Sequence, residues 1–357
     1  MTSLRTLLRF ITPLALLTQL PPPAIWGAEP TAQEILTEAG LQLVGRHWTC
    51  AEESDLRRQL ELMPKFERNL ASAQQQFRQL VGQYQETRTK FTTLKSLLAD
   101  NRARLSQTNV LAALQKQQLE SEANRYSEQM SQAEKAIQTR LNALDETSEM
   151  TLASVEHVNA RNALAVCLLT VTRQVEETRQ RYMQLAADRR IATAIGQAAA
   201  GQLLGPIENY EVVARRRVAR LEPLVFGDGV PIYRRSGMFR ASAIAAEQTL
   251  VTFSYMGVQG PTLIPASLAQ SCGAMVLKDA PASQIAEGER QINTRAARVP
   301  SLRWGRHVLR NVPVEILPPE AEDLGARISQ QAFGDLPVSL DEKNLWLQIQ
   351  SAGVPVK

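Results

Sequence analysis

The feature that most constrains this chain is a stripe of apolar residues between Phe66 and Leu98. Successive positions of the stripe are alternately four and three residues apart, a spacing that keeps them on one face of a helix and is typical of a coiled-coil seam. No proline interrupts the chain from Lys65 to Gly205. One long helix is therefore predicted, with a narrow apolar face that another helix must cover. The stripe consists of Phe66, Leu70, Ala73, Phe77, Leu80, Tyr84, Thr87, Phe91, Leu94 and Leu98, of which only Thr87 is neither apolar nor aromatic.

A second stripe of the same kind follows after a short polar stretch. Asp100 and Asn101 favour a turn, so the two helices are expected to fold back as an antiparallel hairpin with its tip near Asp100–Arg102. Residues near Phe77 should then face residues near Asn124. The second stripe consists of Leu119, Ala123, Tyr126, Met130, Ala133, Ile137, Leu141 and Leu144.

Helical patterns continue beyond the hairpin. A break or cap is expected at Asp145–Ser148, followed by an amphipathic helix that reaches Arg190 and a last helix over Ile207–Leu221. The helical coiled-coil domain is therefore placed at residues 51–222. Such an arm strongly indicates the architecture and only weakly indicates the function, because a spacer and a dimerisation arm use the same pattern.

Residues 1–28 have the pattern of a secretory signal peptide. Arg5 and Arg9 flank or precede the apolar run Phe10–Leu20, and a proline-rich break and Ala28 follow it. The protein is therefore expected to be exported, either to a periplasm or out of the cell. The alternative is an uncleaved N-terminal anchor, and no other contact with a membrane is expected. Residues 29–50 form an N-terminal segment with one short helix that ends near Gly40.

Composition and charge argue against several kinds of protein. The formal net charge of +4 on 357 residues is too small to indicate a nucleic-acid partner. The cysteines and histidines are scattered without the spacing of a metal site, so neither a metal nor another cofactor is expected. Because export leads to an oxidising compartment, Cys50 and Cys167 are the candidate pair for a disulfide.

A change of pattern at Pro223–Gly229 marks a domain boundary. Prolines return, and the apolar segments shorten to the length of strands. A mostly-β domain is predicted over residues 225–350, with a tail at 351–357, so the whole chain is expected to be a multi-domain α + β protein. The expected strands are Val230–Arg235, Met238–Ala245, Leu250–Tyr255, Arg298–Trp304, His307–Leu309, Val312–Leu317, Val338–Leu340 and Leu345–Ile349, and a helix is expected over Ala321–Phe333.

The stretch from Val251 to Gly273 combines an apolar strand, a glycine-bounded turn, the step Thr262–Pro265 and a short helix. This order resembles the segment around the catalytic turn of retropepsin-like aspartic proteases, which have a pepsin-like β fold. The resemblance covers about residues 225–350, and Asp323 departs from it because the family has Leu at that position. The later motifs in the family's order are Trp304-Gly305-Arg306, Val312–Leu317, Asp323-Leu324-Gly325 and Leu340-Asp341.

The resemblance places Met256 where the family has its catalytic aspartate. Aspartic proteases activate water between two carboxylates that share a proton, and a domain of this size supplies one of the two, so a homodimer is implied. A homodimer of this chain would have no such pair, because a thioether does not ionise. The family's Asp-Thr-Gly-Ala-Ser motif falls on Met256, Gly257, Val258, Gln259 and Gly260, directly after Tyr255.

The resemblance therefore implies a catalytically inactive relative of these enzymes. The nearest acids, Asp228 and Asp279, do not stand on a strand-to-helix turn flanked by glycine. We expect a non-catalytic exported envelope protein in which a coiled-coil arm presents the degenerate domain to a peptide or protein partner. One alternative is an active retropepsin-like aspartic endopeptidase that works as a homodimer with a displaced aspartate. Another is a cell-envelope adaptor or hydrolase activator with a coiled-coil hairpin, an analogy of architecture alone.

Overall fold

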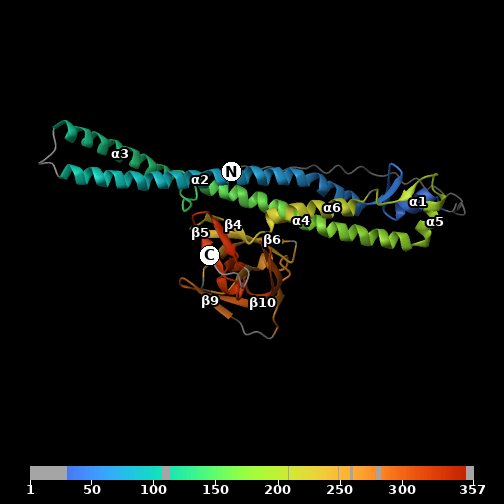
Figure 1. Ribbon diagram of the computed structural model, residues 1–357. Coiled ribbons are helices and arrows are strands. Elements are labelled where there is room, and N and C mark those ends of the chain that lie inside the picture. Colours follow the sequence, from blue (N-terminus) through green and yellow to red (C-terminus); the bar gives the residue numbers. More distant parts are fainter. Residues whose placement is uncertain are drawn as a thin grey trace, which may run out of the picture.

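The computed structural model describes residues 30–106, 113–207, 209–247, 249–257, 260–278 and 283–350. The predicted signal segment at 1–28 and the tail at 351–357 lie outside these ranges. Figure 1 shows a long helical arm with a β domain packed against its side. The expected order, a long antiparallel helical hairpin followed by a mostly-β domain, is confirmed.

Three long helices build the arm: α2 (Ala51–Ser106), α3 (Ala113–Thr139) and α4 (Glu149–Ala187). At 56 residues, α2 is about 84 Å long, and it packs against α3 toward one end and α4 toward the other. The predicted stripe faces these partners, because each of its members is buried or half-buried. The buried ones are Leu70, Ala73, Phe77, Leu80, Leu94 and Leu98.

Two shorter helices, α5 (Arg189–Gln197) and α6 (Tyr210–Val225), pack against α4. Pro223 lies inside α6, so this helix runs slightly past the predicted end of the helical domain. Of the helices in the described ranges, none is both long and apolar enough to cross a membrane.

The tip of the hairpin lies beyond the predicted position. Asp100–Arg102 lies inside α2, which continues to Ser106, and α3 begins at Ala113. Asn101 is buried, and its Nδ2 donates a hydrogen bond to Oε2 of Glu122 at 3.3 Å. Because α3 supplies this partner, the turn propensity of the Asp-Asn pair does not end the helix.

The register of the hairpin shifts with its tip. Phe77 belongs to a buried cluster with Leu141 and Met150. Asn124 follows Glu122 closely and therefore lies near the level of Asn101, many turns away along α2. The expectation that Phe77 faces Asn124 is wrong, because α2 runs past the residues that were predicted to form the turn.

The predicted break before α4 is confirmed. Ser148 is the N-cap of α4, and its Oγ accepts a hydrogen bond from the amide of Thr151 at 3.1 Å. The loop before it also contacts the β domain, because Oε1 of Glu146 accepts a hydrogen bond from the amide of Gly237 at 2.8 Å. The end of α3 and the start of α4 are therefore fixed beside the β domain.

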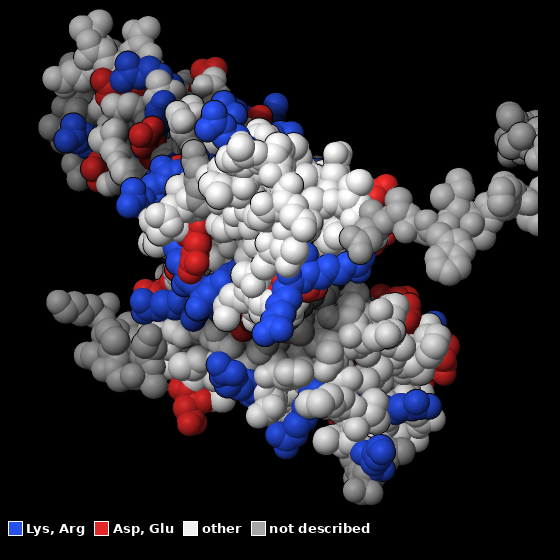
Figure 2. Space-filling view, turned by 90° about the vertical axis from the view of Figure 1, so that its right-hand side faces the viewer, with Lys and Arg blue, Asp and Glu red and all other residues white. Residues whose placement is uncertain are grey.

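The segment after residue 29 forms a small α/β unit at the end of the arm rather than a helix alone. Helix α1 (Ala32–Glu38) precedes a hairpin of β1 (Leu41–Val44) and β2 (His47–Cys50), and β2 pairs in parallel with β3 (Leu203–Leu204). Figure 2 views the molecule from this end, and uncharged residues form much of its nearer face. The buried core of the unit consists of Leu36, Leu41, Trp48, Cys50, Tyr182, Leu185, Ile191 and Ala194.

The C-terminal domain is a closed β-barrel. Its strands follow the order β5, β6, β12, β7, β11 and β10, and a pairing of β5 with β10 closes the ring. These strands are β5 (Met238–Ala245), β6 (Thr249–Tyr255), β7 (Leu263–Pro265), β10 (Arg290–Trp304), β11 (His307–Leu317) and β12 (Arg327–Ile328).

Further strands extend the barrel at two places. β4 (Gly229–Arg235) pairs with β5, and the terminal hairpin of β13 (Val338–Asp341) and β14 (Trp346–Ile349) pairs with β4. On the other side, β8 (Met275–Val276) and β9 (Ser283–Glu287) pair with β10. The expected strands in the first meander and in the terminal hairpin are therefore confirmed.

In this domain, the bounds of three predicted strands differ from those that the structure shows. The segments His307–Leu309 and Val312–Leu317 form one strand, β11, although Asn311 takes a positive φ of 51°. The predicted strand Arg298–Trp304 is the second half of the longer β10.

The helix expected over Ala321–Phe333 is wrong. The segment contains two short 3-10 helices, Pro319–Leu324 and Gln330–Phe333, on either side of β12. Gly325, with φ of 65°, ends the first one and lets the chain enter β12, which pairs in parallel with β6. The apolar residues of this segment are therefore placed by the strand pairing of the barrel, and they do not form one face of a helix.

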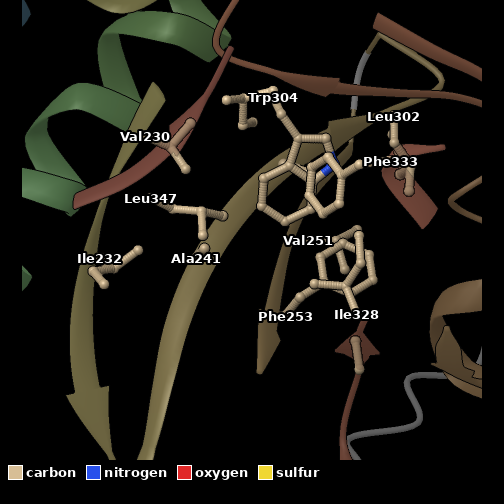
Figure 3. Packing of buried hydrophobic residues seen from close by; sticks show 14 of the residues in the cluster. Val230, Ile232, Ala241, Val251, Phe253, Leu302, Trp304, Ile328, Phe333 and Leu347 are labelled. Carbon is tan, nitrogen blue, oxygen red and sulfur yellow. The ribbon is translucent and has the colours of Figure 1, made fainter. Parts of the chain in front are cut away.

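Aromatic rings fill the centre of the barrel (Figure 3). Trp304 is fully buried, and its ring lies 5.5 Å from that of Phe253 and 5.4 Å from that of Phe333. Such aromatic contacts add to the stabilisation that the buried area provides. The surrounding aliphatic residues include Val230, Ile232, Ala241, Val251, Leu302, Ile328 and Leu347.

The arm and the barrel share one hydrophobic cluster. Leu80 of α2 and Ala153 of α4 belong to the same buried cluster as Val230 and Ile232 of β4. The hydroxyl of Ser154 on α4 also donates a hydrogen bond to the carbonyl of Ile232. The barrel is therefore packed on the arm, and the two parts are not joined through the chain alone.

Candidate functional site

The candidate site is the turn that follows β6. The amide of Ser254 donates to the carbonyl of Ala326, and the amide of Met256 donates to that of Ile328, both at 2.9 Å. These two bonds continue the parallel β6–β12 pairing into the turn. A third bond, from the amide of Gln330 to the carbonyl of Gly257 at 2.7 Å, holds the next residue. The start of the turn is thus fixed to β12 and the 3-10 helix after it.

Glycines let the chain change direction in this turn. Gly257 and Gly260 have φ values of 70° and 93°, which other residues rarely adopt. Val258 and Gln259, which complete the predicted motif, lie outside the described residues. The described part of the turn agrees with the expected glycine-bounded geometry.

Beyond the turn, the chain forms the expected strand and short helix. β7 pairs in parallel with β11, and the amide of Glu315 donates to the carbonyl of Thr262 at 2.8 Å. Pro265 precedes α7 (Ala266–Ala269), and Gly273 (φ 65°) ends this segment. The predicted sequence of strand, turn, strand step and short helix is therefore present.

Met256 stands at the position that the sequence resemblance assigns to the catalytic acid. Its side chain is 39% exposed, and its thioether sulfur is only a weak hydrogen-bond acceptor. The preceding Tyr255 is half-buried, and burial raises the pKa of its phenol. In the described part of the turn, no side chain carries a carboxyl group. These residues therefore offer no group that could act as the general base of a peptidase near neutral pH.

Of the two nearest acids in the sequence, the structure describes Asp228. Asp228 precedes β4, forms an ion pair with Arg306 and accepts a hydrogen bond at its carbonyl from the amide of Ile349. Asp279 lies outside the described residues. Asp228 is therefore part of the contact between β4, β14 and the β10–β11 turn.

An arginine on β12 lies beside β6. Arg327 pairs with Ser254 in the strand register, and its guanidinium makes two hydrogen bonds, of 2.7 and 2.8 Å, with the carboxylate of Glu287. These hydrogen bonds lower the pKa of Glu287 below its usual range. The arrangement is a bidentate ion pair that ties the β9–β10 hairpin to β12.

The structure does not bring Cys50 and Cys167 together. The amide of Cys50 lies 3.3 Å from the hydroxyl of Tyr182, whereas the thiol of Cys167 contacts Gln59. Tyr182 and Cys167 are on α4, about 22 Å apart along the helix axis. Both cysteines are free thiols in the structure, as is Cys272, and burial raises the pKa of all three. The candidate disulfide therefore does not form, because α2 begins level with Tyr182 rather than with Cys167.

Sequence reasoning missed an exposed edge at β8. Met275, Val276 and Leu277 are 56%, 50% and 41% exposed. β8 pairs with β10 at Ala297 and Arg298. The sequence signal was an apolar run directly after Gly273, which is too short to stand out by periodicity.

Similarity to known proteins is found in the structure of part of the chain. No protein-family model matches the sequence, and no curated protein matches it. A retropepsin-like aspartic protease from Rickettsia conorii, whose crystal structure is known, is structurally similar to part of the chain. The match covers 34% of this chain and 96% of that protein, with 12% sequence identity and a TM-score of 0.27.

Proposed function

We propose that this protein is an exported, non-catalytic envelope protein whose helical arm presents a degenerate retropepsin-like domain to a peptide or protein partner. The observation that carries the proposal is Met256 in the turn after β6, with an exposed fraction of 39%. A side chain in this position can meet solvent or a partner, and a thioether can contact an apolar partner but cannot move a proton.

The residue after Met256 also supports an inactive site. In the resembled enzymes, a threonine hydroxyl ties two catalytic turns together and a small glycine lets the turns approach. Gly257 has no hydroxyl, and Val258 is larger than the glycine it replaces. Restoring an acid at Met256 alone should therefore not restore activity.

The exposed strand β8 supports the binding role. An extended peptide can add to a sheet edge through backbone hydrogen bonds and place alternate side chains on the sheet. Met275–Leu277 offers such an edge with apolar side chains, and Arg298 on the adjacent β10 adds a positive charge. We therefore place the peptide contact at β8, with a preference for apolar and acidic peptides.

The export half of the proposal rests on residues 1–28. Arg5, Arg9 and the apolar run after them have the composition of a signal segment. After export, the arm would act as a spacer that holds the barrel at a fixed place along its length. N-terminal sequencing of the protein from the envelope fraction should begin near residues 25–29, and a cytosolic protein that begins at Met1 would contradict export.

A cleavage assay tests the absence of catalysis. The purified full chain is incubated with a diverse peptide library at acid and at neutral pH, with and without pepstatin. We expect no cleavage from the wild type, from Met256→Asp or from its matched control Met256→Asn. Cleavage that pepstatin blocks, and that a single change such as Asp228→Asn or Asp279→Asn abolishes, would overturn the proposal and favour the active homodimer.

A display experiment tests the binding role. Peptides selected from a phage library on the full chain are tested again on Val276→Lys, with Leu114→Lys as the control, because Leu114 is 69% exposed on α3. We expect the change on β8 to reduce binding by roughly tenfold or more and the control to have no effect. Equal binding to both variants would place the peptide contact elsewhere, and a loss of binding with Leu114→Lys alone would favour the adaptor alternative, in which the hairpin is the binding surface.

A further inference from the structure

A cavity of about 300 Å³ lies where the arm meets the barrel. Phe77 and Arg78 of α2 and His157 of α4 form one side, and Asp341, Asn344 and Trp346 of the β13–β14 hairpin form the other. The cavity is distinct from the turn after β6 and from the edge at β8. It is large enough for a small organic molecule.

His157 is the buried polar group in this cavity. Its side chain is 4% exposed, and its ring stacks between those of Phe77 and Trp346, with centroid distances of 5.5 and 6.3 Å. Its Nδ1 is shielded from solvent and has no hydrogen-bond partner among the described residues, which is uncommon for a buried polar atom in a folded protein. The imidazole also lines the cavity, so a ligand bound there would lie against it.

The charges around His157 favour an anion. Arg78 makes no ion pair with any residue in the described ranges, and the buried Arg161 donates its Nη2 only to the carbonyl of Val225. Together with burial, these two cations lower the pKa of His157 to about 4, so the imidazole is neutral near neutral pH.

Asp341 does not neutralise this positive charge by an ion pair. Its Oδ1 accepts hydrogen bonds from the amides of Lys343 and Asn344, and its Oδ2 accepts one from Nδ2 of Asn344 at 2.7 Å. The carboxylate thus shapes the hairpin turn. Its negative charge still lines the cavity, but it forms no ion pair with Arg78, so this guanidinium can pair with a carboxylate from outside the chain.

We infer that this cavity binds a small organic anion with one carboxylate and an apolar or aromatic body. The carboxylate pairs with the guanidinium of Arg78 and hydrogen bonds with His157, and the body lies against Phe77 and Trp346. Arginine suits carboxylate because its planar fork offers two parallel donors. Since the cavity joins α2, α4 and the hairpin, the bound anion also ties the barrel to the arm.

Proton uptake should accompany binding. An anion beside His157 favours the charged imidazolium, so binding raises the pKa of this histidine and affinity increases as the pH falls toward 5. The charged groups that line the site are Arg78 on α2 and Asp341 on the hairpin, and the charge of Arg161 on α4 also acts on His157. The negative charge of Asp341 persists while its carboxylate is hydrogen bonded, so it repels the anion and lowers the affinity of the site for it.

The experiment uses benzoate as the probe and the histidine ring signals of the full chain as the readout. The sequence has three histidines, so His157→Gln identifies the signal of His157. We expect a saturable shift of that signal below about 10 mM benzoate, tighter at pH 5.5 than at pH 7.5, and a smaller effect with acetate, which lacks the aromatic body. Sodium chloride at the same ionic strength should have no effect.

Two matched variants decide which residue holds the carboxylate. Arg78→Gln should weaken benzoate binding by roughly tenfold, whereas Arg88→Gln, an exposed arginine of α2 outside the cavity, should leave it unchanged. Equal binding to both variants, or no saturable shift of the His157 signal with benzoate in the wild type, would overturn the inference. Thermal unfolding of both variants shows whether each is folded before the titration.

Discussion

Trp346 of the terminal hairpin stacks on His157 of α4, with ring centroids 6.3 Å apart and an interplanar angle of 23°. The contact joins the two parts of the molecule, because one residue belongs to the barrel and the other to the arm. Phe77 of α2 continues the stack on the other side of His157, 5.5 Å away. Three segments that are far apart in the sequence therefore meet in one aromatic ladder.

Removing Trp346 should loosen the barrel from the arm. Trp346 is half-buried, so Trp346→Ala should cost about 2–3 kcal/mol, below the 3–5 kcal/mol of a fully buried ring. Chemical denaturation followed by far-UV circular dichroism and by tryptophan fluorescence measures the loss. We expect the two signals to coincide in the wild type and to separate in the variant, while Leu114→Ala on the exposed side of α3 changes the free energy of unfolding by less than about 0.5 kcal/mol.

This ladder could not be predicted from the sequence, and the reason is physical. Periodicity shows which face of a helix is apolar, and the stripe from Phe66 to Leu98 was found in this way. It does not show which distant segment covers that face. The half of the stripe around Phe77 faces α4 and the barrel, whereas the half around Leu94 faces α3.

Local propensity also led to wrong predictions of secondary structure at two places. Asp100 and Asn101 have the composition of a turn, but Glu122 on α3 satisfies the amide of Asn101 and the helix continues. The apolar residues of 321–333 fit a helical period, but Arg327 and Ile328 form a short strand that pairs with β6. The two glycines that bound the predicted turn after β6, Gly257 and Gly260, do take positive φ values, because glycine is the residue that the sequence offers for such a change of direction. The His157 cavity leaves no signal in the sequence, since its walls come from both domains.

Leu80 should contribute more to stability than its place in a two-helix seam suggests. It is 7% exposed and belongs to the cluster that α2 shares with the barrel. Leu80→Ala should therefore cost about 2–5 kcal/mol. Leu97→Ala is the matched control on the same helix, because Leu97 is 39% exposed and should cost less than about 1 kcal/mol. Equal losses in urea denaturation would contradict the shared core.

The register of the hairpin can be tested by engineered cysteine pairs and a short bis-maleimide cross-linker. A cysteine pair at Asn101 and Glu122 should be cross-linked, because the polar ends of the native side chains are 3.3 Å apart. A pair at Phe77 and Asn124 should not, because those residues lie many turns apart. The three native thiols are buried, and the unsubstituted chain shows whether they react. Cross-linking of the Phe77–Asn124 pair alone would contradict the observed register and support a hairpin tip at Asp100–Arg102.

Acid should destabilise the fold through His157. Burial and the charges of Arg161 and Arg78 lower its folded pKa from 6.5 to about 4, so the unfolded chain binds this proton more tightly. The stabilisation is therefore complete above pH 6.5 and is lost as the pH falls toward 4, by up to roughly 3 kcal/mol. His157→Gln should flatten this part of the profile, whereas His47→Gln, on β2 at the end of the arm, should leave it intact. Urea unfolding at several pH values measures both slopes, and parallel profiles for the wild type and His157→Gln would show that folding does not lower the pKa of His157.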